Sequence, residues 1–212
     1  MRALKLISWL ALGAVFLAAC GEEAAFSEAP VAPSAAPVAA APTARARTTL
    51  ADAQGATLAV LMPRDDGGGW RIEDEAGDKT GSLRVTDDRV NAKDAADRRT
   101  GRAKRRDYGF KVEDAHEETV LKVQRRDQRF RLKRGDDQVI GWWTGARIEL
   151  NGGVVIDAIE ADGRVTVRRA GAPVATVEGP FPAQAALFLG LTEELSLEQR
   201  LAAMVFVREV RF

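Results

Sequence analysis

Short segments in which apolar and polar residues alternate make up most of the chain after residue 50. Alternation with a period of two is the pattern of a strand with one buried and one solvated face. Asp, Asn and Gly separate the segments, and these residues favour tight hairpin turns. The expected strands cover residues 57–62, 70–74, 82–86, 89–93, 108–112, 119–124, 129–133, 138–143, 146–150, 154–159, 165–169 and 174–177. About twelve short strands predict a mainly β domain, an antiparallel barrel or barrel-like meander.

A weak internal repeat supports this interpretation. The segment Trp70-Arg-Ile-Glu-Asp, a turn and Leu83-Arg-Val recur about 38 residues later as Phe110-Lys-Val-Glu-Asp, a turn and Leu121-Lys-Val. A single strand pair cannot bury its apolar face, so repetition around an axis is a natural way to close a core.

The C-terminal segment changes to helical patterns. Pro182 suits the first turn of a helix, and residues 183–191 carry no charge, which predicts a helix that is buried on all faces. Ser196-Leu-Glu-Gln199 matches a capping box and predicts a second helix that runs toward Val210. Two arrangements are open: the helix pair covers one barrel mouth, or residues 183–191 lie inside the barrel.

The first residues have the organisation of a bacterial export signal. Arg2 and Lys5 precede an uncharged apolar run over residues 6–19, which is shorter than the ~20 residues of a membrane span. The sequence Leu17-Ala-Ala-Cys20-Gly21 then resembles the lipobox of bacterial lipoproteins. The alternative is a plain N-terminal membrane helix in which Cys20 is a small buried residue.

The lipobox resemblance implies covalent chemistry at Cys20. Residues 1–19 would be removed as a signal peptide, and Cys20 would carry a diacylglyceryl thioether and an acylated amino group, such as a palmitoyl chain. Two or three acyl chains hold a protein stably in a bilayer. No Asp follows Cys20, and in bacteria with two membranes an Asp there retains lipoproteins at the inner membrane. The resemblance therefore favours a cell-envelope protein of the outer membrane over the inner membrane.

Residues 20–49 are rich in Ala and carry four prolines between residues 30 and 42. Such a segment buries too little surface to offset its chain entropy, and the prolines argue against an Ala-rich helix. The sequence therefore predicts a disordered tether, followed by one β-rich domain with a helical tail over residues 50–212.

Composition excludes several function classes. Lys+Arg and Asp+Glu are equal at 31 each, so the chain is not a basic nucleic-acid coat, and nucleic acid is not an expected partner. One Cys and one His cannot build a Cys- or His-based metal site, and phosphate-loop and nucleophile-elbow motifs are absent. We therefore expect no metal, no cofactor and no enzymatic activity.

Charge is unevenly distributed along the domain. Residues 65–97 carry ten acids and five bases, whereas residues 98–134 carry fourteen bases and six acids. The run over residues 98–106, expected on a loop, predicts an anion-binding surface for phosphate, lipopolysaccharide or anionic headgroups. The alternative is a solvated loop that pairs with the acids of residues 65–97. The candidate residues are Arg98, Arg99, Arg102, Lys104, Arg105 and Arg106.

Trp142 and Trp143 are adjacent on an expected strand, so one ring should face the core and the other should face outward. The outward ring is a candidate contact for a sugar, a lipid or a partner protein, and the alternative is packing or cover of a strand edge.

The domain resembles the tubby, phospholipid-scramblase and LURP-one superfamily. The matching residues are Trp70, Ile72, Asp74 and Gly77, then Phe110, Val112 and Asp114, and then the apolar segment 183–191. The resemblance covers residues 57–191 and implies a barrel around a buried C-terminal helix. It also implies a binding module at membranes, often through phosphorylated lipid headgroups. His116 and Glu117, where a Gly is expected, and a helix after Ser196 depart from the family pattern.

Together these observations predict a lipid-anchored envelope protein that presents a non-catalytic binding or structural module. Its partners would be the membrane, through Cys20, and anionic lipid or another envelope component. One alternative is a barrel that carries or senses a hydrophobic ligand, and an envelope hydrolase is a more remote one. The interior decides between the first two, because Leu187, Phe188 and Leu189 leave no ligand cavity if they fill the barrel.

Overall fold

A computed structural model describes residues 46–210 of the chain. The predicted signal peptide, the predicted lipidation site Cys20 and the predicted tether up to residue 45 lie outside the described residues. Within residues 46–210, no helix has both the length and the apolar composition needed to cross a membrane.

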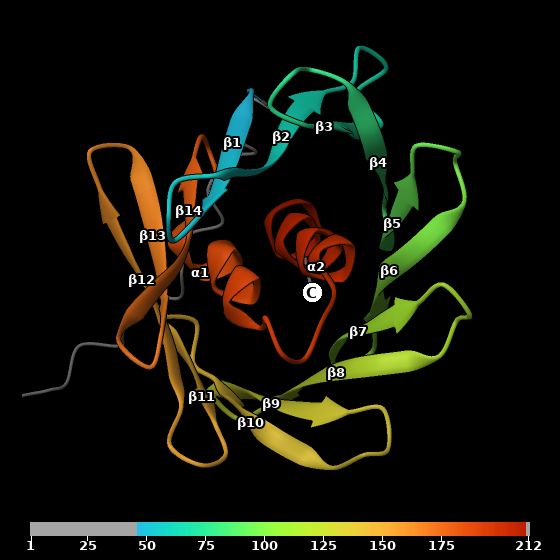
Figure 1. Cartoon of the computed structure of the whole chain (residues 1–212). Coiled ribbons are helices and arrows are strands. Elements are labelled where there is room, and N and C mark those ends of the chain that lie inside the picture. Colours follow the sequence, from blue (N-terminus) through green and yellow to red (C-terminus); the bar gives the residue numbers. More distant parts are fainter. Residues whose placement is uncertain (1–45, 211–212) are drawn as a thin grey trace, which may run out of the picture. The chain divides into compact units, whose positions relative to one another are not determined.

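Fourteen antiparallel strands form one closed barrel, in which each strand pairs with its neighbour in sequence and β1 closes the ring between β14 and β2 (Figure 1). The strands are β1 (Thr48–Asp52), β2 (Thr57–Pro63), β3 (Gly69–Glu73), β4 (Lys79–Thr86), β5 (Arg89–Asp94), β6 (Arg99–Arg106), β7 (Gly109–Asp114), β8 (Thr119–Arg126), β9 (Arg129–Arg134), β10 (Val139–Trp143), β11 (Arg147–Leu150), β12 (Val155–Ala161), β13 (Arg164–Arg169) and β14 (Ala172–Glu178). The predicted barrel class is confirmed.

The structure contains two strands more than expected. β1 begins at Thr48, two residues before the expected start of the domain, and its pairing with β14 closes the barrel. β6 occupies most of the basic run that was expected on a loop. Its inward residues are Gly101 and Ala103, which are too small to give a visible alternation among six basic neighbours.

The internal repeat has a unit of 20 residues, and four units run from β3 to β10. The inward residues that open the units are Trp70, Val90, Phe110 and Phe130. Trp70 and Phe110 are therefore 40 residues apart, rather than the expected 38, because two units separate them. Each unit is a strand, a turn of four or five residues at one barrel end, a second strand and a turn of two or three residues at the other end.

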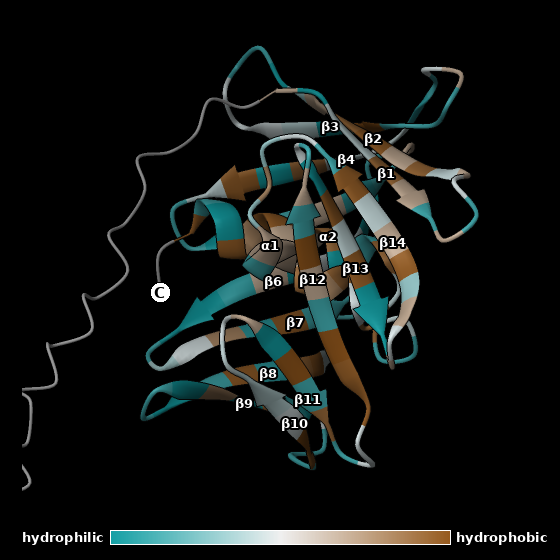
Figure 2. Cartoon of the chain, turned by 90° about the vertical axis from the view of Figure 1, so that its left-hand side faces the viewer, coloured by the Kyte–Doolittle hydropathy of each residue, from teal (hydrophilic) through white to brown (hydrophobic). Residues whose placement is uncertain are grey.

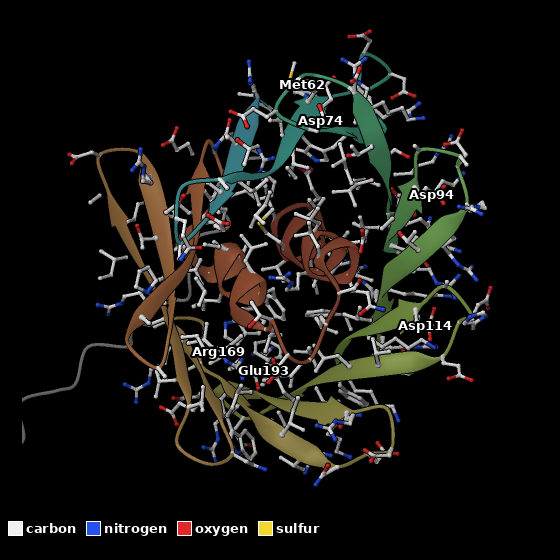
Figure 3. All side chains as sticks on the ribbon, in the orientation of Figure 1. Met62, Asp74, Asp94, Asp114, Arg169 and Glu193 are labelled. Carbon is white, nitrogen blue, oxygen red and sulfur yellow. The ribbon has the colours of Figure 1, made fainter. Side chains whose placement is uncertain are left out.

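A capping Asp closes the turn in three of these units. The Asp94 Oδ1 atom accepts hydrogen bonds from the backbone N–H groups of Ala96 and Arg98, both at 2.9 Å, and Asp114 makes the same pair of bonds within its own turn. Asp74, Asp94 and Asp114 lie at successive hairpins around the wall (Figure 3). Such an Asp replaces a backbone partner within the turn, which explains why it recurs with the repeat.

Because the strands alternate in direction, the turns fall at two barrel ends. The β1 end is the end at which β1 begins, and it includes the turns at 64–68, 87–88, 107–108, 127–128, 144–146 and 162–163. The opposite end, here called the α2 end, includes the turns at 53–56, 74–78, 95–98, 115–118, 135–138, 151–154 and 170–171.

Two helical segments occupy the barrel interior (Figures 1 and 2). The helix α1 (Ala183–Ala186) continues as a 3₁₀ turn, η1 (Leu187–Gly190), and the loop after it leads to α2 (Leu197–Glu209). The predicted capping box is present, because Ser196 and Gln199 each accept a hydrogen bond from the other's backbone. The helices therefore fill the barrel and do not cover its mouth.

Aromatic side chains join the helices to the wall. Phe188 is fully buried, and its ring centroid lies 5.6 Å from that of Phe110 and 5.2 Å from that of Trp143. Phe206 of α2 packs on the same Phe110 at 4.8 Å. These contacts place one continuous core along the barrel axis.

Replacing Phe188 by Ala should lower the free energy of unfolding by about 4 kcal/mol, because it removes a fully buried ring and leaves a cavity between two elements. The measurement is urea unfolding of the purified protein. Tyr108→Ala is the control and should change stability by less than about 0.5 kcal/mol, because its side chain is exposed. Equal effects of the two substitutions would contradict the filled-barrel arrangement.

Candidate anion-binding rim

The residues of the basic run divide according to the strand geometry of β6. Gly101 and Ala103 face inward, so Arg102 and Lys104 project from the outer wall. A Cβ atom on Gly101 would lie 3.1 Å from the Cγ atom of Gln199, which shows how closely α2 approaches the wall. The expectation that the run forms a loop is therefore wrong, because all of its cations except Arg98 lie on β6.

Three of the six candidate cations are neutralised by nearby acids. Arg98 bonds Asp94 at 2.8 Å, Arg99 bonds Glu117 at 2.8 Å, and the Arg102 Nε atom donates to Glu113 at 2.6 Å. The hydrogen bond from Arg99 holds the pKa of Glu117 below its ordinary value. Only Arg98 pairs with an acid of residues 65–97, and the other two use the next hairpin.

Glu113 is the most enclosed member of this network, with a side chain that is 2% exposed. It forms ion pairs with Arg102 and with Lys111. Burial by itself raises the pKa of Glu113, but the hydrogen bonds and charges of Lys111 and Arg102 outweigh it and lower the pKa. The ionised carboxylate therefore holds these two cations in place on the wall.

The strand register places five cations directly opposite one another on the outer face of β5 to β9. Register pairs join Arg89 to Lys104, Lys104 to Lys111, Lys111 to Lys122, and Lys122 to Lys133. Like charges on directly opposite positions destabilise a sheet unless acids compensate them.

Acids compensate this row at both ends and in the middle. Asp88 bonds Arg89 at 2.8 Å, Glu113 pairs with Lys111, and Asp137 bonds Lys122 at 3.0 Å and Lys133 at 3.4 Å. The hydrogen bond from Lys122 lowers the pKa of Asp137. Within residues 46–210, Lys104 has no ion pair. The hydrogen bond from Arg89 lowers the pKa of Asp88, and the charge of Lys104 adds to this effect. Lys104 is therefore the least compensated position of the row.

Exposed arginines gather beyond Lys104, at the β1 end. The tripeptide Arg-Arg-Asp ends β6 and recurs 20 residues later at the end of β8. The register places Arg126 opposite Arg129 on the next strand. We call these residues the arginine rim: Arg105, Arg106, Arg125, Arg126 and Arg129.

Four of the rim arginines have no ion pair in the part of the chain that the structure describes, namely Arg105, Arg106, Arg125 and Arg126. All four are exposed, and they come from two adjacent hairpins. Asp107 and Asp127 follow them in the turns, so these two hairpins carry five guanidinium groups against two carboxylates at the rim. Asp88 of the neighbouring turn accepts a backbone hydrogen bond from Arg105 through its carbonyl oxygen, and its carboxylate pairs with Arg89. Arg105 and Arg106 were among the predicted candidates, whereas Arg125, Arg126 and Arg129 were missed. The 20-residue recurrence of Arg-Arg-Asp is the signal that would have found them.

The two tryptophans divide between the core and the surface as the alternation predicts. Trp143 is buried and packs on Phe130 at 4.9 Å and on Phe188. Trp142 faces outward, and the Arg129 guanidinium lies 3.8 Å from its ring centroid. Trp142 is therefore an aromatic surface at the edge of the rim, covered by a rim arginine.

An open cleft of about 720 Å³ lies at the α2 end, between the turns at 115–118 and 135–138 and the loop that joins the helices. Arg169 fixes this loop through bonds of 3.1 Å to Glu193 and to Glu194, and Figure 3 shows Arg169 beside Glu193. No three His, Cys, Asp or Glu side chains among the described residues are placed to hold a metal ion. The cleft carries charges of both signs and has no feature that selects a ligand.

No family model and no curated protein matches the chain. Among solved structures, an X-ray structure of a protein from Arabidopsis thaliana shares 11% sequence identity with it. The alignment covers 62% of this chain and 80% of that chain, with a TM-score of 0.21. A score this low carries no argument about family or function.

The lowered pKa of Glu113 makes one part of the stability dependent on pH. A carboxyl whose pKa is lower in the folded state contributes stability above its unfolded pKa, and this contribution disappears as pH falls through the folded pKa. Glu113→Gln should lower the free energy of unfolding by about 2 kcal/mol near pH 7. The difference from the original protein should shrink as pH falls below 4.5, the ordinary value for Glu.

Urea unfolding at a series of pH values measures this difference. Glu118→Gln is the matched control, because Glu118 is an exposed residue of the following turn with no ion pair in residues 46–210. A Glu113→Gln effect that is equally large at pH 3 and pH 7 would show that the ion pairs contribute nothing.

Proposed function

We propose that this chain is a lipid-anchored protein of the bacterial cell envelope whose barrel is a non-catalytic module that binds anionic groups. The lipobox-like sequence before Cys20 supports the anchor, and the absence of an Asp after Cys20 favours the outer membrane. Acyl chains on Cys20 would make the membrane one partner. Anionic lipid or another anionic envelope component would be the second.

The arginine rim is the observation that carries the binding role. Four exposed guanidinium groups without ion pairs in the described part of the chain come together from two hairpins. Leaving them uncompensated is unfavourable for the isolated sheet, because neighbouring like charges repel. Arginine binds phosphate and carboxylate oxygens in a two-pronged geometry, so an anionic ligand would relieve this repulsion.

The filled interior supports an external binding surface over the alternative of a barrel that carries a hydrophobic ligand. Leu187, Phe188 and Leu189 are fully buried along the barrel axis. A carrier would have to displace these side chains, which are part of the core.

The resemblance to the tubby, phospholipid-scramblase and LURP-one superfamily is the finer part of the proposal. A closed barrel around apolar C-terminal helices agrees with it, whereas fourteen strands and a second interior helix differ from the family pattern. Membership would imply binding of phosphorylated lipid headgroups, which agrees with the chemistry of the rim.

Replacing Cys20 by Ala tests the anchor. The mature original protein should carry acyl chains and should remain in the membrane fraction after a high-salt wash. The variant should lack the acyl mass and should incorporate no labelled palmitate. Mass spectrometry of the purified N-terminal peptide is the measurement. Palmitate incorporated into the Cys20→Ala variant would show that Cys20 is not the site.

Replacing Arg105, Arg106, Arg125 and Arg126 together by Ala tests the binding role. The protein, purified in a nonionic detergent, should elute from a phosphocellulose column at a clearly lower salt concentration after this change, because four phosphate contacts are lost. The matched control replaces Arg71, Arg98, Arg147 and Arg164, which are exposed arginines that each have a carboxylate partner. Equal elution of the two variants would show that net charge, and not the rim, determines retention.

A further inference from the structure

The polypeptide enters the barrel at the same end as the arginine rim. Thr48 is the first residue of β1 and pairs with Leu61, near the end of β2. The turn that follows β2, at 64–68, lies at the β1 end of the barrel. Arg105 and Arg106 flank the turn at 107–108, which belongs to the same end. A lipid anchor on the preceding segment would therefore be joined to the barrel at this end.

Exposed apolar groups have the same location. Among residues 46–210, the two large hydrophobic side chains that remain exposed are Tyr108, at 77%, and Ile159, at 47%. Tyr108 lies in the turn that joins β7 to β6, directly after the arginines that end β6. Ile159 lies two residues before the last residue of β12, which is at the β1 end of the barrel. Trp142, one residue before the end of β10, lies near the same end. Aromatic groups beside arginines suit the boundary between lipid headgroups and acyl chains.

The α2 end has the opposite character. The loop between the helices carries Glu193 and Glu194, and the turn at 115–118 adds Glu117 and Glu118. Asp136 and Asp137 lie in the next turn at that end. Most of these acids pair with cations, as Glu117 does with Arg99 and Glu193 does with Arg169, but the end presents no cluster of exposed arginines without ion pairs among residues 46–210. An anionic surface would therefore attract the rim more strongly than the α2 end, which favours one orientation.

We infer that the barrel docks with its β1 end on the anionic surface of the bilayer that holds its own anchor, with the α2 end and its cleft facing away. This inference rests on the proposed lipid anchor. The chain from Cys20 to Thr48 spans at most about 90–100 Å when fully extended, so the anchor keeps the rim at a high local concentration of headgroups. Weak contacts from the rim then suffice to orient the barrel.

Site-specific labels test the orientation in the full mature chain. Cys20 is the sole cysteine, and acylation blocks its thiol, so an introduced cysteine becomes the one free thiol for a fluorescent probe. Tyr108→Cys places the probe at the β1 end. His116→Cys places it on an exposed turn at the α2 end of the same wall. Vesicles of phosphatidylcholine and phosphatidylglycerol that contain a nitroxide-bearing lipid report proximity to the bilayer by quenching.

Strong quenching is expected at position 108 and little at position 116. Replacing the four arginines Arg105, Arg106, Arg125 and Arg126 by Ala, or using phosphatidylcholine alone, should reduce the docked-to-undocked ratio at position 108 by about tenfold or more. Weak quenching at position 108 on anionic vesicles, or equal quenching at both positions, would overturn the proposed orientation.

A second measurement separates failure of docking from failure of the anchor. Mass spectrometry of each labelled sample reports whether Cys20 carries acyl chains. An acylated protein without quenching at position 108 would overturn docking and leave the anchor standing. A protein without acyl chains would overturn the anchor. In that case, quenching at position 108 by added anionic vesicles would support the docking surface, and its absence would overturn the surface as well.

Discussion

The need to fill a wide barrel governs this structure. A closed barrel of about eight strands is just filled by its own inward side chains, so fourteen strands enclose a space that needs further occupants. The segments α1, η1 and α2 meet this requirement, and Phe188 and Phe206 join them to Phe110 of the wall. Because the axis is filled, the chemistry available to a partner lies on the outer wall and at the two barrel ends.

The same repeat that closes the barrel also arranges its charges. A unit of 20 residues returns the chain to the same height two strands further around the barrel, so the two Arg-Arg-Asp segments lie at the same end with β7 between them. The register of neighbouring strands places Lys104, Lys111, Lys122 and Lys133 in a row. Acids at the strand ends and in the turns neutralise most cations toward the α2 end, as Glu113 of β7 does for Arg102, whereas four arginines of the rim at the β1 end have no ion pair among residues 46–210. The two ends of the barrel therefore differ in the number of cations that lack an ion pair.

This difference between the barrel ends connects the proposed lipid anchor with the proposed anion-binding surface. An anchor at Cys20 would hold the barrel close to a membrane, and the rim lies at the end where the anchored segment enters the barrel. A surface of modest affinity is sufficient in that arrangement, because tethering replaces a search through solution with a local encounter. Tyr108 and Trp142 would add aromatic contacts beside the arginines.

The sequence by itself determined the mainly β class, most strand positions, the capping box at Ser196 and the opposite directions of Trp142 and Trp143. These features depend on local periodicity and on residues within a few positions of each other. It did not reveal β6, because the inward side of that strand is small: Gly101 and Ala103 leave room for α2, which lies some hundred residues later in the chain. Only the tertiary structure decided which of the six predicted cations are available. Register brings Glu113 and Glu117 to Arg102 and Arg99 and leaves Arg105 and Arg106 beside Arg125 and Arg126. An ion pair depends on distance in space, and strand register sets that distance between residues that the sequence keeps apart.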